Sequence, residues 1–160
     1  MPEAIRGQAG AGSVDVYTVP RDHMLRLELL TFTLTTDATA GVHAPAVIFT
    51  DPAVAAVTGR IWDWNEGGPS MTLYYTFGIG LAPFDCTLTT GMLVPVALPD
   101  TILAHDTVIT VESLNVAGAS IAGDQISNVI LYGELLDLLS DTPVSLPDLI
   151  PGLLPGEAAA

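Results

Sequence analysis

The feature that most constrains this chain is its supply of β-branched residues, since 14 Val, 17 Thr and 10 Ile make up 41 of the 160 residues. Branching at Cβ restricts these side chains in a helix, whereas the pleated surface of a sheet accommodates them well. Glycines (15) and prolines (12) are spread along the sequence and break it into short segments. The composition therefore predicts an all-β domain with little or no helix.

Eight segments have the pattern of β-strands, and residues 70–79 show it most clearly because apolar and polar residues alternate there without a break. In the long segment 25–36, the apolar residues switch from odd to even positions after Leu29, which predicts a β-bulge or a bend. Pro95 lacks an N–H donor, so its segment is predicted to be an edge strand. The eight predicted strands are residues 14–19, 25–36, 46–50, 54–62, 70–79, 92–98, 107–114 and 124–136.

Eight antiparallel strands in two packed sheets is the strand count of a jelly roll, and an immunoglobulin-like sandwich fits nearly as well. The loop at 37–44 and the strand that changes phase favour the jelly roll. We expect a jelly-roll-like, eight-stranded antiparallel β-sandwich over residues 13–136. Residues 46–50 are apolar on both faces, which predicts a central strand. Residues 1–12 are small, polar and Gly-rich, which predicts a flexible N-terminal arm.

Residues 137–160 form a second predicted arm, rich in Pro and Leu. Prolines recur every four residues, at 143, 147, 151 and 155, and this spacing prevents a continuous helix and favours an extended chain. The arm is more apolar than disordered tails usually are. It is either a frayed terminus or a segment that lies on its own domain or on a neighbouring subunit. The interface residues of the second interpretation are Leu138, Leu139, Leu146, Leu149, Ile150, Leu153 and Leu154.

The charge is strongly one-sided, with 18 acidic residues, four arginines, no lysine and a net charge of −14. Nucleic acids and anionic membranes are polyanions, so we expect neither as a partner. The chain has no run of about 18 apolar residues, which argues against a membrane-spanning helix. Its single cysteine, Cys86, has no cysteine to pair with and no basic neighbour to activate it, and we expect a small apolar residue.

No phosphate-binding loop, C-x-x-C, H-E-x-x-H or G-x-S-x-G motif occurs, so we expect no enzyme and no cofactor. His23, His43 and His105 each lie in or beside a predicted loop. A cupin-like metal site would require them to converge, and their spacing does not supply this, so we expect solvated loop histidines. Aspartates at the strand ends could bind calcium, but Asp is also a common turn residue, and we favour that role.

Aromatic residues suggest one binding alternative. Trp62, Trp64 and Tyr74, together with Asn65, could form a face on which sugars stack. The competing interpretation places Trp62 and Tyr75 in the core, with Trp64 and Tyr74 covering a sheet face or an interface. We favour the second, because the core of a sandwich needs large side chains.

Four short stretches carry a resemblance to a known class of proteins. They are YTVPRDHMLRLELLTFTLTTDATA at residues 17–40, Y-T-F-G at 75–78, L-P at 98–99 and A-G-D-Q-I-S-N-V-I-L at 122–131. Together they resemble small virion proteins of tailed bacteriophages, over about residues 14–136. The sequence departs from that pattern at residues 20–23, where the family usually has Pro-Ala-Gly, and the Pro/Leu-rich arm lies outside the resemblance.

The resemblance implies a jelly-roll protein that decorates or cements the capsid, or that sits at a fibre base, with no catalytic residues. The expected partner is the major capsid protein, bound where its subunits meet on the capsid exterior, after synthesis in the host cytoplasm. Capsid sites have threefold symmetry, so we expect a homotrimer. The alternative is a carbohydrate-binding, host-adsorption module of a phage tail or fibre that uses the aromatic face.

Overall fold

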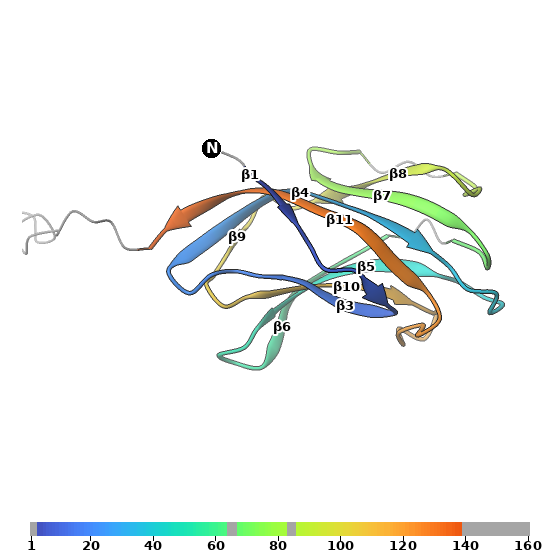
Figure 1. Ribbon diagram of the computed structural model, residues 1–160, viewed down its shortest axis with the longest axis horizontal. Helices are drawn as coiled ribbons and strands as arrows, with labels where there is room; N and C mark the ends of the chain where they lie inside the picture. Colours follow the sequence, from blue (N-terminus) through green and yellow to red (C-terminus); the bar gives the residue numbers. More distant parts are fainter. Residues whose placement is uncertain (1–2, 64–66, 83–85, 139–160) are drawn as a thin grey trace, which may run out of the picture.

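Two β-sheets pack face to face in the computed structural model, which describes residues 3–63, 67–82 and 86–138 (Figure 1). One sheet contains β1 (Glu3–Arg6), β2 (Gly10–Ala11), β4 (His23–Thr35), β7 (Thr72–Ile79), β8 (Leu93–Leu98), β9 (Ile102–Leu103) and β11 (Gln125–Asp137). The other contains β3 (Ser13–Thr18), β5 (Ala44–Asp51), β6 (Ala56–Trp62) and β10 (Val108–Leu114). These ranges hold no helix, as the composition predicts, and therefore none that could cross a membrane.

Each of the eight predicted segments overlaps one of the longer strands, with ends that differ by up to two residues, and the structure adds the short strands β1, β2 and β9. The larger sheet runs in the order β1-β11-β4-β7-β8, with β2 beside β11 and β9 beside β4, and the smaller one in the order β3-β10-β5-β6. β5 is central and β8 lies at an edge, as predicted. The prediction of a wholly antiparallel sandwich is wrong in one place, since β8 runs parallel to β7. A parallel pair needs a long connection, and residues 80–92 provide it.

Four sets of antiparallel partners are nested along the chain. The innermost pair is β5 with β6, followed outward by β4 with β7, by β3 with β10, and by β1 and β2 with β11. The pairs β4·β11 and β5·β10 join these partners into the two sheets. The result has the connectivity of one long hairpin that is folded around a common core.

The N-terminal arm differs from the expectation. Instead of a flexible segment over residues 1–12, the structure has β1 and β2 along β11, with Ile5 opposite Leu131 and Gly10 opposite Ile126. Ile5 also packs against the core. Strands of four and two residues are too short to show a recognisable alternation, which is why the composition alone suggested flexibility.

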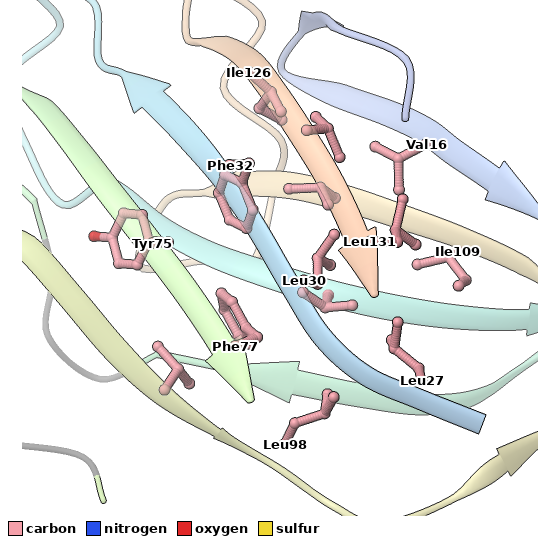
Figure 2. Close-up of a cluster of buried hydrophobic side chains, with 14 of the residues drawn as sticks. Val16, Leu27, Leu30, Phe32, Tyr75, Phe77, Leu98, Ile109, Ile126 and Leu131 are labelled. Atoms are coloured by element: carbon pink, nitrogen blue, oxygen red, sulfur yellow. The ribbon is translucent and has the colours of Figure 1, made fainter. Parts of the chain in front are cut away.

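The core lies between the sheets and includes three neighbouring aromatic rings, Phe32, Tyr75 and Phe77 (Figure 2). Phe32 stacks on Tyr75 and on Phe77, with ring centroids 5.6 and 5.7 Å apart. Ile109 comes from the opposite sheet and is fully buried. Burial of side chains of this size stabilises a fold by about 1.5–3 kcal/mol each.

The change of phase in β4 is a β-bulge, as predicted. Tyr132 of β11 faces Leu29, whereas the next residue, Gly133, faces Leu27, so that Glu28 is the extra residue. The buried apolar residues of β4 accordingly fall at odd positions up to Leu27 and at even positions from 30 to 34. The bulge lets one long strand keep its apolar residues on the core throughout.

Candidate functional site

The described residues contain one cluster of possible metal ligands, formed by Asp37, His43 and Asp124, whose ligand atoms lie within 4.8 Å of one another. His43 precedes β5, Asp124 precedes β11, and Asp37 lies in the loop after β4. His43 is 1% exposed and Asp124 is completely buried. The expectation of a solvated His43 is therefore wrong.

The Asp124 carboxylate and both ring nitrogens of His43 are engaged in hydrogen bonds. The Asp124 carboxylate accepts from the backbone N–H of Asp37 (2.8 Å), from Nδ1 of His43 (2.8 Å) and from the Ser113 hydroxyl. On its other side, Nε2 of His43 lies 2.9 Å from the carbonyl oxygen of Thr39. Both ring nitrogens thus face acceptors, an arrangement that suits the doubly protonated imidazolium.

The electrostatics favour that charged form. Burial by itself lowers the pKa of His43, but the hydrogen bonds to Asp124 and to the Thr39 carbonyl raise it more, so the pKa lies above its usual value. The Asp37 carboxyl accepts from the backbone N–H of Thr39 (2.8 Å), which lowers its pKa. A positive imidazolium beside a negative carboxylate makes burial of both groups tolerable.

The contacts in this cluster join parts of the fold and do not activate a nucleophile. Ser113 donates to Asp124, whereas activation of a serine nucleophile would require its hydroxyl to contact the histidine. A metal ion bound to His43 would have to replace the hydrogen bond on whichever ring nitrogen it took. The network instead ties the loop after β4 to the ends of β10 and β11.

The three histidines do not converge. His23 pairs with Asp22 (2.7 Å) and with Asp137 (2.8 Å) at the far end of β11. Asp124 and its partner His43 lie at the beginning of that strand, which has 13 residues and so spans about 43 Å. His105 contacts Asp106 at 3.2 Å and is half exposed. A three-histidine metal site is therefore not formed.

Two aspartates have the turn role expected from the sequence. Asp37 accepts from the N–H of Thr39 and Asp51 from that of Ala53, each at 2.8 Å and two residues ahead. Asp124 departs from this role, because its acceptors serve His43 and Ser113 instead.

The aromatic candidates lie on different sheets. Trp62 on β6 packs over Ala46, Ile48 and Leu114, on the side of the smaller sheet that faces away from the core. Tyr74 on β7 is 41% exposed on the outer side of the larger sheet. Trp64 and Asn65 lie outside the described residues. No shared platform for a sugar is therefore formed by Trp62 and Tyr74.

The interface leucines are described only at Leu138, which is 41% exposed and follows the end of β11. The other six, Leu139, Leu146, Leu149, Ile150, Leu153 and Leu154, lie outside the described residues.

The outer side of the larger sheet has a property that the sequence analysis did not find. Residues that face one another across β1, β11, β4, β7 and β8 form rows on this outer side. In three adjacent rows, the described strands carry a single charged residue, Arg6 at the β1 edge. We call the uncharged part of these rows the neutral face. It consists of Ala4, Tyr132, Leu29, Gly78 and Ala97, then Ile130, Thr31, Thr76 and Pro95, then Thr33, Tyr74 and Leu93.

Exposed apolar side chains stand out on the neutral face. Leu93 is 72% exposed, Tyr74 41% and Tyr132 38%. The charges resume beside this face, at Glu28 in the bulge, and in the next row, where Arg26 is paired in register with Glu134. The signal in the sequence was the alternating threonines of residues 31–35 and 72–76, but their common face depends on strand order.

Comparison with protein-family models, with curated proteins and with solved structures finds no match for this chain. A functional proposal therefore rests on the residues and on the geometry described above.

Proposed function

We propose that this chain is a structural virion protein that binds through its neutral face to the outside of a phage capsid, where it decorates or cements junctions between major capsid subunits. The neutral face is the observation that carries the proposal. The resemblance to small virion proteins of tailed bacteriophages suggests the capsid as the particular partner.

The argument from charge begins with the net charge of −14. Such a chain repels its own copies and any acidic partner at most of its surface. A face that spans five strands without an acidic residue can contact a protein without burying an unpaired carboxylate. Charged residues are likewise scarce at the centres of protein interfaces.

The size of the neutral face indicates what else must contribute. Five strands and three rows cover about 20 Å by about 20 Å, or about 400 Å². A standard interface buries about 800 Å² on each partner. Neighbouring elements must therefore extend the footprint, and we propose that a homotrimer does so around a threefold axis of the capsid.

The nested strand pairs support a jelly roll as the finer fold. If β1 and β2 count as the first strand, the first strand pairs with the last, the second with the seventh, the third with the sixth and the fourth with the fifth. These eight strands form two sheets of four, and β8 and β9 are additions to one of them. The alternative as a glycan-binding module has less support, since Trp62 and Tyr74 lie on different sheets.

The test is cosedimentation of the purified protein with empty capsids of the phage that encodes it. The double variant Leu93→Glu/Tyr132→Glu places two charges on the neutral face and should reduce binding at least about tenfold, since a buried unpaired charge costs several kcal/mol. Val116→Glu is the matched control, because Val116 is 77% exposed in the loop after β10 and should tolerate the change. Equal binding by both variants, or binding to glycans and not to capsids, would refute the proposal.

A further inference from the structure

We propose that the open edge of β6, with the cleft beside it, binds the chain's own C-terminal segment, residues 143–155, as an added β-strand. The site lies on the smaller sheet, so it is separate from the neutral face and independent of the proposed function.

The cleft has a volume of about 560 Å³ and lies between β6 and the connection of residues 99–104. Its apolar lining comes from both sides, with Phe49 and Ile61 from the smaller sheet and Ile102 and Leu103 from β9. Arg60 of β6 is its one basic residue. Such a cleft suits an extended, largely apolar segment.

β6 offers the backbone for pairing. It is the last strand in the order β3-β10-β5-β6, and among the described strands only β5 pairs with it. An edge strand presents N–H and C=O groups that can accept a further strand. A bulge at Thr58 interrupts the register, so the regular stretch beside the cleft is Gly59–Trp62.

The C-terminal segment starts close to this cleft. The backbone N–H of Leu138 donates to the carbonyl of Asp22 at 2.9 Å, and Leu138 lies near His105 and Asp106. Those two residues belong to the β9–β10 connection, which also supplies Ala104 and Thr107 to the cleft wall. The five residues from 138 to 143 reach up to about 17 Å, and so short a tether keeps the segment at a high effective concentration.

The spacing of the prolines is compatible with an added strand. In a strand, the backbone groups of successive residues point to opposite edges. Prolines at 143, 147, 151 and 155 all have odd numbers, so the missing N–H groups would share one edge. The even residues, among them Leu146, Asp148 and Ile150, keep their N–H groups for the other edge. A strand of this kind can pair on one side only, as the last strand of a sheet does.

Among the charged residues that line the cleft, which include Asp51 and Asp100, Arg60 is the one that suits this segment. Arg60 is exposed and has no ion pair within the part of the chain that the structure describes. The C-terminal segment places one acidic residue, Asp148, between Leu146 and Ile150. An added strand would bring this carboxylate to the guanidinium, while Leu149 and Leu153, whose side chains point to the opposite face, enter the cleft.

The first experiment is hydrogen exchange of the full chain against a truncation that ends at Leu138. Amides of residues 56–62 should exchange at least about tenfold faster in the truncation, because their outward N–H groups lose partners. A synthetic peptide of residues 139–160 should restore the protection. Amides of β4 serve as the internal control for intact folding, and unchanged exchange in β6 would overturn the proposal.

Proline variants test whether the even-numbered residues of the segment donate the N–H groups that pair with β6. Leu146→Pro removes an N–H from the pairing edge and should expose β6 as fully as the truncation does. Ser145→Pro adds a proline on the edge that already lacks donors and should leave β6 protected, and Leu146→Ala separates the loss of the side chain from the loss of the N–H. Equal effects of Leu146→Pro and Ser145→Pro would contradict an added strand.

A charge exchange and a dilution series complete the test. Arg60→Glu should weaken the protection of β6, and Asp148→Arg in the same chain should restore it. Protection that does not change on dilution, with the oligomeric state followed by light scattering, is the expected result. Protection that disappears on dilution would assign the strand to a second copy and overturn the proposal.

Discussion

Nδ1 of His43 lies 2.8 Å from Oδ2 of Asp124, and the two buried side chains connect the beginnings of β5 and β11, 81 residues apart in sequence. These strands belong to different sheets. The pair therefore acts across the sandwich, at one end of the core, where the chain makes its long connections. Further hydrogen bonds, to Ser113 and to the backbone of residues 37–39, connect the pair to β10 and to the loop after β4.

Asp124→Asn should destabilise the fold strongly. The amide cannot neutralise the imidazolium, and it turns one acceptor of the network into a donor that faces Ser113 or His43. Breaking a buried pair costs about 3–5 kcal/mol, equivalent to a fall of about 6–20 °C in Tm for a chain of this size. Thermal unfolding measures it, with Asp106→Asn as the control, since that exposed side chain should change Tm little.

Stability should also depend on pH through His43. Its pKa is raised in the folded state, because the hydrogen bonds to Asp124 and to the Thr39 carbonyl outweigh the effect of burial. A raised pKa means that the folded state binds the proton more tightly than the unfolded chain, whose histidine pKa is about 6.5. The stabilisation of the fold by protonated His43 is thus complete below about pH 6.5 and is lost as the pH rises through the pKa of the folded state.

Urea unfolding at a series of pH values checks this expectation. The free energy of unfolding should fall as the pH rises above about 6.5, and the His43→Gln variant should lack that part of the decrease. A slope that survives in His43→Gln would assign the effect to another group.

Gly133→Ala tests why glycine stands opposite the bulge of β4. A Cβ at this position would lie 2.7 Å from the carbonyl oxygen of Arg26, which is backbone and cannot move aside without disturbing the sheet. We expect a loss of about 1–3 kcal/mol, the usual cost of overpacking. Gly68→Ala is the control, because its Cβ would meet only the flexible end of Met71 and should change the urea midpoint little.

The sequence predicts the positions of the strands well and their arrangement in the sheets less well. Alternation in 70–79 and the change of phase after Leu29 are local patterns, and local patterns predicted β7 and the bulge in β4. The parallel pairing of β8 with β7 depends on the path of residues 80–92, which carry no alternation.

The site was harder to predict than the fold, because its residues come from distant parts of the chain. Nothing near His43 in the sequence indicates Asp124, and a histidine flanked by loop signals is usually solvated. The neutral face likewise requires the strand order, since Leu93, Tyr74 and Thr33 become neighbours only once β8, β7 and β4 are aligned. Local patterns predict which face a side chain takes, and topology decides what lies beside it.

Ile5→Ala tests the N-terminal strand that the composition did not suggest. Ile5 stands opposite Leu131 of β11 and packs on the core while partly exposed, so its truncation should cost about 1–2 kcal/mol, less than for a fully buried isoleucine. Ala4 has the adjacent place on the same strand but points to the outer side, opposite Tyr132, so Ala4→Ser should be nearly neutral. Urea unfolding separates the two variants. If residues 3–6 were a flexible arm, both substitutions would leave the midpoint unchanged, whereas an ordered β1 makes only the inward one costly.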